Sequence, residues 1–153
     1  MVGMVLVTHG DIGKALLTTA RKELGLKEHE MNARAVSIQK DDLLETSLTQ
    51  IREALADIDQ ERGVVMLTDM FGATPANLAT QMMPQGEGKA DILYGMNLPM
   101  LLALAQTPDT MNLRDAVQAA EKAGRENIIC SSSLNPQRHN LTASAPPAST
   151  RHP

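Results

Sequence analysis

Two residues with complementary chemistry stand directly after apolar runs of the chain. His9 ends the stretch "MVLVTH", and Asp69 ends the stretch "GVVMLTD". A carboxylate that accepts a hydrogen bond from one imidazole nitrogen fixes the tautomer and leaves the other nitrogen free to attack an electrophile. The pair is useful only if the fold brings the ends of the two runs together.

The elements that must position this pair alternate between apolar strands and amphipathic helices. Expected strands cover 2–8, 33–38, 63–69, 90–95 and 127–130, and expected helices cover 12–24, 44–58, 74–83, 97–106 and 112–124. This alternation is typical of the doubly wound α/β class, a mainly parallel sheet with helices on both faces. With strand order 2-1-3-4, the order reverses between the first and third strands, where such sheets bind ligands. His9 and Asp69 would then share one crevice.

Several helix ends carry local signals. Gly25 stands where a C-terminal glycine cap belongs, and Asp42 with Glu45 resembles a capping box. Thr74 is expected to cap the third helix, with Pro75 in the first helical position.

His9 is interpreted as a nucleophile rather than a base. A lone histidine at a strand end is more often a structural polar residue, and Asp69 alone would serve as a turn or cap residue. Their expected pairing favours chemistry. No G-x-S-x-G nucleophile elbow follows any strand, so a Ser-His-Asp hydrolase is not indicated.

The segment after Asp69 has the features of an anion site. Gly72 and Ala73 are small enough for close backbone approach, Thr74 offers a hydroxyl, and the following helix starts with unpaired amides. One exposed helix terminus contributes only about 0.3 to 1 kcal/mol toward an anion. We therefore predict that Gly72, Ala73 and Thr74 stabilise a phosphoryl group. Further candidates for the lining are Thr8, Gly10, Thr68, Phe71 and Asn97, the last of which also fits as a helix cap.

Other phosphate chemistries fit less well. In "THGDIGKA" a Walker loop would need Gly at Thr8 and Ser or Thr at Ala15, so this stretch is better interpreted as the turn that starts a helix. No G-x-G-x-x-G follows the first strand. A receiver module phosphorylated on Asp69 remains an alternative, although Asp11 is a weak substitute for the acidic pair that binds its metal.

Composition excludes several classes. The net charge is -4, with 14 Lys and Arg that are scattered without a basic stripe, and there is one Tyr and one Phe, so nucleic acid is not an expected partner. The single Cys130 cannot form an internal disulfide and has no metal-ligand cluster around it, which favours a cytoplasmic setting without metal or cofactor. No signal peptide or membrane span is recognised. We expect one domain over 1–130 and a Ser/Pro/Ala-rich disordered tail over 131–153.

Three stretches resemble a known family. "MVLVTHGDIGKALL", "VVMLTDMFGATPANLA" and "GMNLPMLLALA" are similar, in order and spacing, to signature stretches of the mannose-type IIA components of the bacterial phosphoenolpyruvate-dependent sugar phosphotransferase system. The resemblance runs from about Met1 to Cys130.

The resemblance implies a phosphotransferase with a phosphohistidine intermediate on His9, oriented by Asp69. The phosphoryl group would come from the histidine protein HPr and pass to a IIB component, and through it to a membrane permease. Phe71 would lie beside the donor-docking surface. The family also implies a homodimer in which a C-terminal strand, here 127–130, crosses to the partner's sheet.

Two departures leave the biological role open. Some relatives continue through an Ala/Pro-rich linker into a fused IIB domain, whereas this chain ends at Pro153. The acceptor is then a separate IIB component, or the protein is a regulator that signals through its phosphorylation state. No motif of the sequence indicates a sugar-binding site, so sugar specificity is not predicted.

Overall fold

The computed structural model describes residues 1–134. Of the tail predicted over 131–153, the first four residues form a short helix and the rest lies outside the described residues. The strands are β1 (Gly3–His9), β2 (Ala33–Ile38), β3 (Val64–Thr68) and β4 (Ala90–Tyr94). The helices are α1 (Ile12–Leu24), the short 3-10 helix η1 (Glu28–Glu30), α2 (Leu44–Ala56), α3 (Thr74–Met82), α4 (Leu98–Ala105), α5 (Leu113–Glu126) and the short α6 (Ser131–Leu134).

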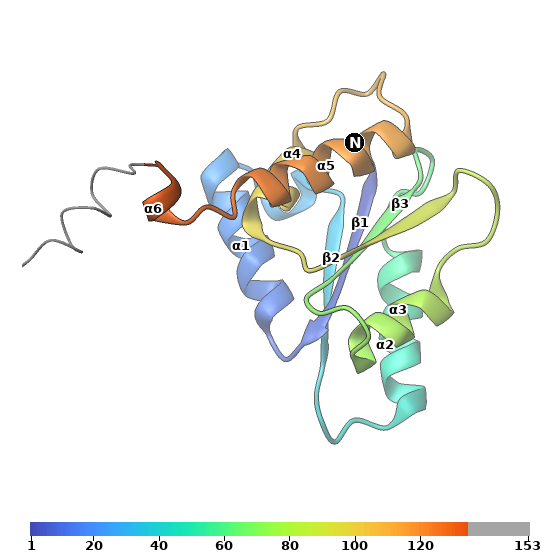
Figure 1. The fold of residues 1–153 in the computed structure, drawn as a ribbon. Helices are drawn as coiled ribbons and strands as arrows, with labels where there is room; N and C mark the ends of the chain where they lie inside the picture. Colours follow the sequence, from blue (N-terminus) through green and yellow to red (C-terminus); the bar gives the residue numbers. More distant parts are fainter. Residues whose placement is uncertain (135–153) are drawn as a thin grey trace, which may run out of the picture.

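The four strands form one parallel sheet in the order β2-β1-β3-β4, as predicted. Alternate residues of β1 face opposite sides of this sheet because side chains in a strand point to its two faces in turn. Met4 and Leu6 pack in a cluster with α1, α4 and α5, whereas Val5 and Val7 pack in a second cluster with α2 and α3. Figure 1 shows the two groups of helices on opposite sides of the sheet. The sheet is therefore covered on both faces.

The close approach of α1 to β1 requires a glycine. A Cβ at Gly13 would lie 3.1 Å from Thr8 Oγ1 and 3.3 Å from Leu6 Cβ. The Gly13 amide donates to Thr8 Oγ1 at 2.9 Å. The stretch that imitates a nucleotide loop is thus the turn at which α1 begins, and its second glycine serves helix packing.

The strand predicted over 127–130 needs a partner's sheet beside it, and in the single chain these residues leave α5 as an exposed segment without strand pairing. Two other local predictions were wrong. Helix α5 continues to Glu126, past the predicted end at Gly124, because that glycine is buried against Met100. Asp42 does not cap α2. Its carboxylate accepts from the Gln39 amide at 2.8 Å, and Leu43 occupies the cap position.

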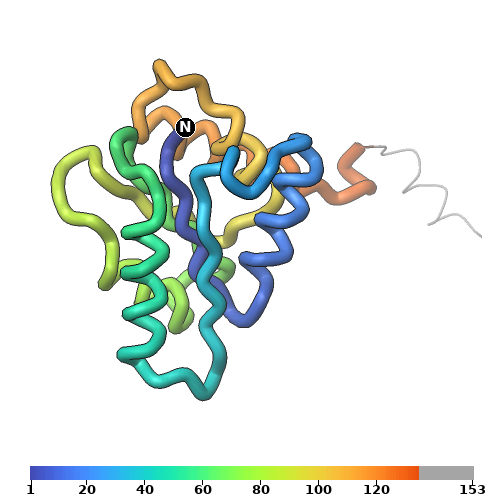
Figure 2. The backbone as a smooth tube through the Cα atoms, turned by 180° about the vertical axis from the view of Figure 1, so that it is seen from behind, coloured from blue at the N-terminus to red at the C-terminus, as the bar shows by residue number. Residues whose placement is uncertain are grey.

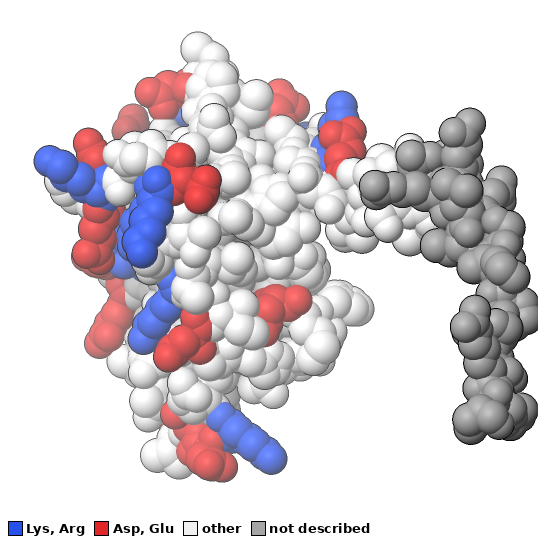
Figure 3. Space-filling model, turned by 90° about the vertical axis from the view of Figure 1, so that its left-hand side faces the viewer, with Lys and Arg blue, Asp and Glu red and all other residues white. Residues whose placement is uncertain are grey.

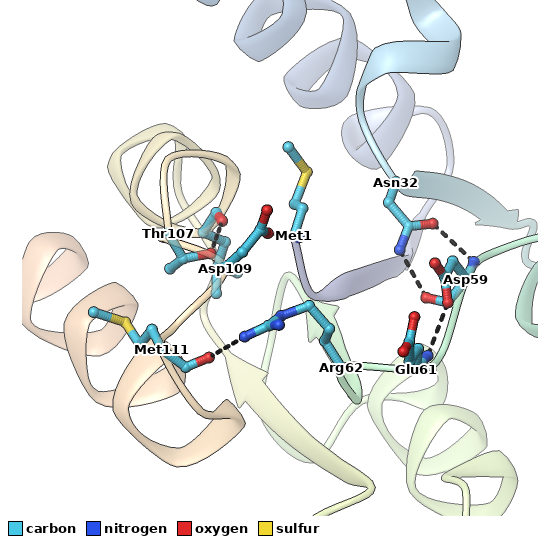
Figure 4. A network of polar contacts seen from close by, with 9 residues as sticks. Met1, Asn32, Asp59, Glu61, Arg62, Thr107, Asp109 and Met111 are labelled. Carbon is cyan, nitrogen blue, oxygen red and sulfur yellow. Dashed lines mark hydrogen bonds and ion pairs between the residues drawn. The ribbon is translucent and has the colours of Figure 1, made fainter.

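The amino edge of the sheet is joined by polar contacts (Figure 4). The Met1 ammonium donates to Asp109 at 2.6 Å and holds the pKa of that carboxyl below its ordinary value. Arg62 donates to the Met111 carbonyl at 3.0 Å. These contacts join the chain terminus and the loops at the amino edge of the sheet.

We expect Gly13→Val to lower the free energy of unfolding by about 1 to 3 kcal/mol, because the added side chain has no space against Thr8 and Leu6. Urea denaturation monitored by circular dichroism measures the loss. Ala15→Val, at an exposed position two residues further along α1, is the matched control and should cost less than about 1 kcal/mol. Equal losses in the two variants would contradict the role given to Gly13.

Candidate functional site

His9 and Asp69 meet at the carboxyl edge of the sheet. β1 and β3 are neighbours in parallel register, with Val7 opposite Thr68, so the residues that follow these positions leave the sheet side by side. His9 Nδ1 lies 2.7 Å from Asp69 Oδ2, and the His9 amide donates to the same oxygen at 3.2 Å. The predicted convergence of these two residues is therefore confirmed as geometry.

The environment of the pair is asymmetric. The His9 side chain is 46% exposed, whereas that of Asp69 is 13% exposed. A carboxylate facing Nδ1 assigns the proton of the neutral ring to that nitrogen, and Nε2 keeps its lone pair. Asp69 Oδ1 is buried and has no hydrogen-bond partner within residues 1–134. The carboxylate thus directs its interactions to His9, and the histidine offers its other nitrogen to an incoming group.

The turn after His9 is fixed from both sides. Thr8, which is fully buried, donates from its hydroxyl to the Gly10 carbonyl at 3.2 Å while it accepts from the Gly13 amide. Gly10 has a φ of 48°, and its amide donates to the Ile38 carbonyl of β2 at 2.9 Å. A positive φ of this kind favours glycine. Thr8 therefore holds the turn from beneath, and Gly10 forms part of the surface.

A cavity of about 430 Å³ opens beside the histidine. Its lining residues are His9, Gly10, Ile38, Gln39, Lys40 and Thr74. Figure 2 shows β1 and β2 side by side, with the loop after β2 extending beyond the end of β1. Sequence reasoning missed the three residues from β2 and this loop. The available signal was the strand order, which places the carboxyl end of β2 beside that of β1.

The first helical residue of α3 is Thr74, one residue before the predicted Pro75. Ala73 has the extended backbone of a cap, with φ -82° and ψ 169°, and Thr74 is the first helical residue. The prediction of Thr74 as cap was wrong because Pro75 fits the second helical position as well as the first. The exposed Thr74 therefore does not cap α3 and lines the cavity beside His9. Gly72, with a φ of 77°, makes the turn that leads into α3.

Three other candidates lie away from this cavity. Thr68 is fully buried, and its hydroxyl has no partner among the described residues. Phe71 is 77% exposed and packs edge-on against Tyr94, with ring centroids 5.0 Å apart. Asn97 caps α4 by accepting from the Met100 amide, and it donates to the Gly124 carbonyl at 3.1 Å. Phe71 and Asn97 line a second groove, of about 560 Å³, along β4 and α5.

Residues 1–134 contain neither a metal-binding cluster nor a membrane-spanning helix. There is no group of three or more His, Cys, Asp or Glu side chains that could hold a metal ion. In the same range, every helix is too short or too polar to cross a membrane.

Comparison with known proteins assigns the family. The family described as "PTS system fructose IIA component" matches residues 3–121. The fructose-specific EIIA component of Bacillus subtilis is 29% identical over 135 residues, which cover 88% of this chain and 90% of that protein. The mannose-specific EIIAB component of Escherichia coli is 30% identical over 128 residues, which cover 83% of this chain but 38% of that longer protein.

Solved structures show the same fold. The mannose/sorbose-specific IIA subunit from Enterococcus faecalis superposes with a TM-score of 0.70 at 20% identity, over 84% of this chain and 93% of that one. The IIA protein associated with a fucose utilization operon in Streptococcus pneumoniae gives 0.66 at 24% identity, over 88% and 100%. The chain therefore belongs to the fructose and mannose family of IIA components, the phosphotransfer proteins of the sugar phosphotransferase system.

Proposed function

We propose that the protein accepts a phosphoryl group from phospho-HPr on His9 Nε2 and passes it to a IIB component. The observation that carries this proposal is the 2.7 Å contact between His9 Nδ1 and Asp69 Oδ2. It selects the tautomer in which Nε2 is nucleophilic, on a ring that is 46% exposed and so accessible to a second protein. A cytoplasmic setting belongs to the same proposal.

The transfer forms one N–P bond on this chain and requires no proton transfer to or from it. The lone pair of Nε2 attacks phosphorus in line as the N–P bond of the donor histidine breaks, and that electron pair returns to the donor ring. His9 keeps its Nδ1 proton, so its ring becomes positive as the new N–P bond forms. Asp69 faces this new charge across the hydrogen bond and stabilises it. The reverse sequence of events delivers the group to the IIB component.

The phosphoryl oxygens would be steadied by the start of α3. Thr74 lines the cavity with His9, and its exposed hydroxyl is free to donate. The amides at Gly72, Ala73 and Thr74 precede or open a helix, where backbone N–H groups have no internal partner. Their contribution is modest, about 0.3 to 1 kcal/mol for one exposed terminus, which suits a group that must be handed on.

An apolar rim offers a surface on which the donor can dock. Exposed apolar side chains occur in the three segments that follow β1, β2 and β3 at the carboxyl edge. They are Ile12 at 48% exposure, Leu43 at 75%, Leu44 at 58%, Met70 at 57% and Phe71 at 77%. Apolar residues at the centre of an interface supply much of its binding energy, so a protein that approaches His9 would contact this rim.

A homodimer is a second part of the proposal. β4 lies at one end of the strand order. Ile128 and Ile129, which follow α5, are 78% and 56% exposed, and Ile128 borders the 560 Å³ groove along β4. An open strand edge beside exposed apolar residues is a ready surface for pairing with another chain. We propose that the 127–130 segments of two copies exchange there.

Two alternatives remain for the role of the phosphorylated histidine. A regulatory protein would use the same His9 chemistry but signal through its phosphorylation state, and a neighbouring gene for a IIB component or permease would argue against it. A receiver would instead be phosphorylated on Asp69. The contacts favour His9, because Asp69 Oδ2 is engaged by the histidine and Oδ1 is buried.

We expect His9→Ala to abolish labelling when the protein is incubated with phosphoenolpyruvate, enzyme I and HPr. The wild-type label should be acid-labile and stable to alkali, as expected for a phosphohistidine. His29→Ala, in the exposed η1 at the amino edge, is the matched control and should label normally. Label that hydroxylamine releases from Asp69 would contradict the proposal and favour the receiver alternative.

We expect Asp69→Asn to slow transfer from phospho-HPr by on the order of 100-fold, because the amide removes the charge that stabilises the His9 cation and no longer selects the tautomer. Rapid-quench measurement with labelled phospho-HPr gives the rate. Asp11→Asn, which changes an exposed carboxylate bonded to Ser37, should alter it by less than about 3-fold. A metal-dependent receiver would lose labelling in Asp69→Asn altogether and would also depend on Asp11. An unchanged rate in Asp69→Asn would remove this residue from the mechanism.

The dimer is tested by replacing Ile128 and Ile129 together with Ser. Loss of two apolar contacts should weaken self-association by about tenfold or more, as measured by sedimentation equilibrium. Leu43→Ser removes a similarly exposed side chain at the carboxyl edge and should leave self-association unchanged. A wild-type protein that is monomeric at all concentrations would exclude the exchange.

A further inference from the structure

The cavity beside His9 contains one cation that the proposed mechanism does not use. Its six lining residues include only two with ionisable side chains, His9 and Lys40. Lys40 belongs to the loop between β2 and α2 and lines the cavity together with Thr74, the first residue of α3. A group attached to Nε2 that enters this cavity would share it with both Thr74 and Lys40.

The loop that carries Lys40 is held in a closed turn. The Asp42 amide donates to the Gln39 carbonyl at 3.2 Å, and the Asp42 carboxylate accepts from the Gln39 amide at 2.8 Å. These two bonds join the residues on either side of Lys40 and Asp41. The Asp42 carboxylate, which sequence reasoning assigned to helix capping, thus serves to fix the backbone from which Lys40 projects.

The two cations that line the hollow along the outer edge of β2 are paired with carboxylates. On the face shown in Figure 3, lysine and arginine side chains lie beside acidic ones. Lys14 Nζ lies 3.8 Å from Asp11 and borders the hollow along the outer edge of β2, and Arg34 pairs with Asp57. Among the described residues, no ion pair involves Lys40.

A phosphoryl group creates a need for such a cation. It adds about 1.5 to 2 negative charges at neutral pH, close to the carboxylate of Asp69. A single helix terminus neutralises only part of this charge. A lysine ammonium carries three donors on a flexible stem, so it can follow the phosphoryl oxygens without a rigid geometry.

We propose that Lys40 pairs with the phosphoryl oxygens of phosphorylated His9 and thereby stabilises the phosphorylated form of the protein. This inference rests on the proposed function. Lys40 makes and breaks no covalent bond and gives up no proton, since the N–P bond forms at His9 Nε2 as described above. The ammonium interacts with the oxygens alone, and it does so most strongly when they carry two negative charges.

The test uses the isolated phosphoprotein with no partner present. Wild type, Lys40→Gln and Lys40→Arg are phosphorylated with enzyme I and HPr and purified, and the phosphoryl group is then titrated by ³¹P NMR between about pH 5.5 and 9. Loss of the cation in Lys40→Gln should raise the phosphoryl pKa by about half a unit, and Lys40→Arg should restore it. Lys22→Gln, in the last turn of α1 at the opposite edge, is the charge-matched control and should titrate like wild type.

The equilibrium with phospho-HPr provides a second measurement. Lys40→Gln should shift it against the phosphorylated protein by up to about fivefold, as expected for a partly exposed ion pair, and added salt should reduce the difference. A structural defect would not depend on salt in this way. An altered equilibrium with an unchanged ³¹P titration would mean that Lys40 contacts the donor protein, and would overturn the inference. If wild type labels but Lys40→Gln matches it in both measurements, this inference alone fails, whereas an unlabelled wild type refutes the proposed function.

Discussion

The parallel pairing of β1 with β3 is the constraint on which the site depends. Because Val7 lies opposite Thr68, the next residues of both strands leave the sheet at one level, and His9 Nδ1 comes within 2.7 Å of Asp69 Oδ2. Residues distant in sequence become a hydrogen-bonded pair without any loop having to fold back on itself. The same register requires the two helix clusters on the faces of the sheet, since a parallel sheet is stable only when both faces are covered.

The two edges of the sheet differ in where their polar contacts lie. At the amino edge, side chains bond to loops and to the chain terminus, as Arg62 does to the Met111 carbonyl and the Met1 ammonium to Asp109 (Figure 4). At the carboxyl edge the fixed contacts lie beneath the surface, where Thr8 holds the turn after His9 through its hydroxyl. Thr74 and Lys40 are exposed there and line the cavity beside His9. A carrier requires this division, because its reacting edge must be rigid in backbone yet open to successive partners.

The sequence was informative wherever a residue occupies the end of a regular element. The apolar runs placed His9 and Asp69 correctly, since strand order decides which ends are adjacent. The sequence was less informative where the same residue type can have two different structural roles. Gly124 looked like a helix end but is buried against Met100, and Asp42 looked like a cap but closes a turn with the Gln39 amide. The strand predicted at 127–130 depends on a pairing neighbour, which a local pattern does not specify. Lys40 carries no pattern at all, and only the three-dimensional cavity distinguishes it from other lysines.

The unsatisfied oxygen of Asp69 is consistent with a carboxylate that would interact most strongly with His9 once the histidine ring is positively charged. A buried carboxylate oxygen without a donor, such as Oδ1, costs about 1 to 3 kcal/mol. A carboxylate with many donors would be stabilised equally before and after phosphorylation, and would contribute little to the difference between the two states. Within residues 1–134 the bonds of Oδ2 come from His9 alone, so its attraction would grow as that ring became positive in the proposed transfer. In the proposed mechanism, this interaction would favour the phosphorylated form of His9 selectively.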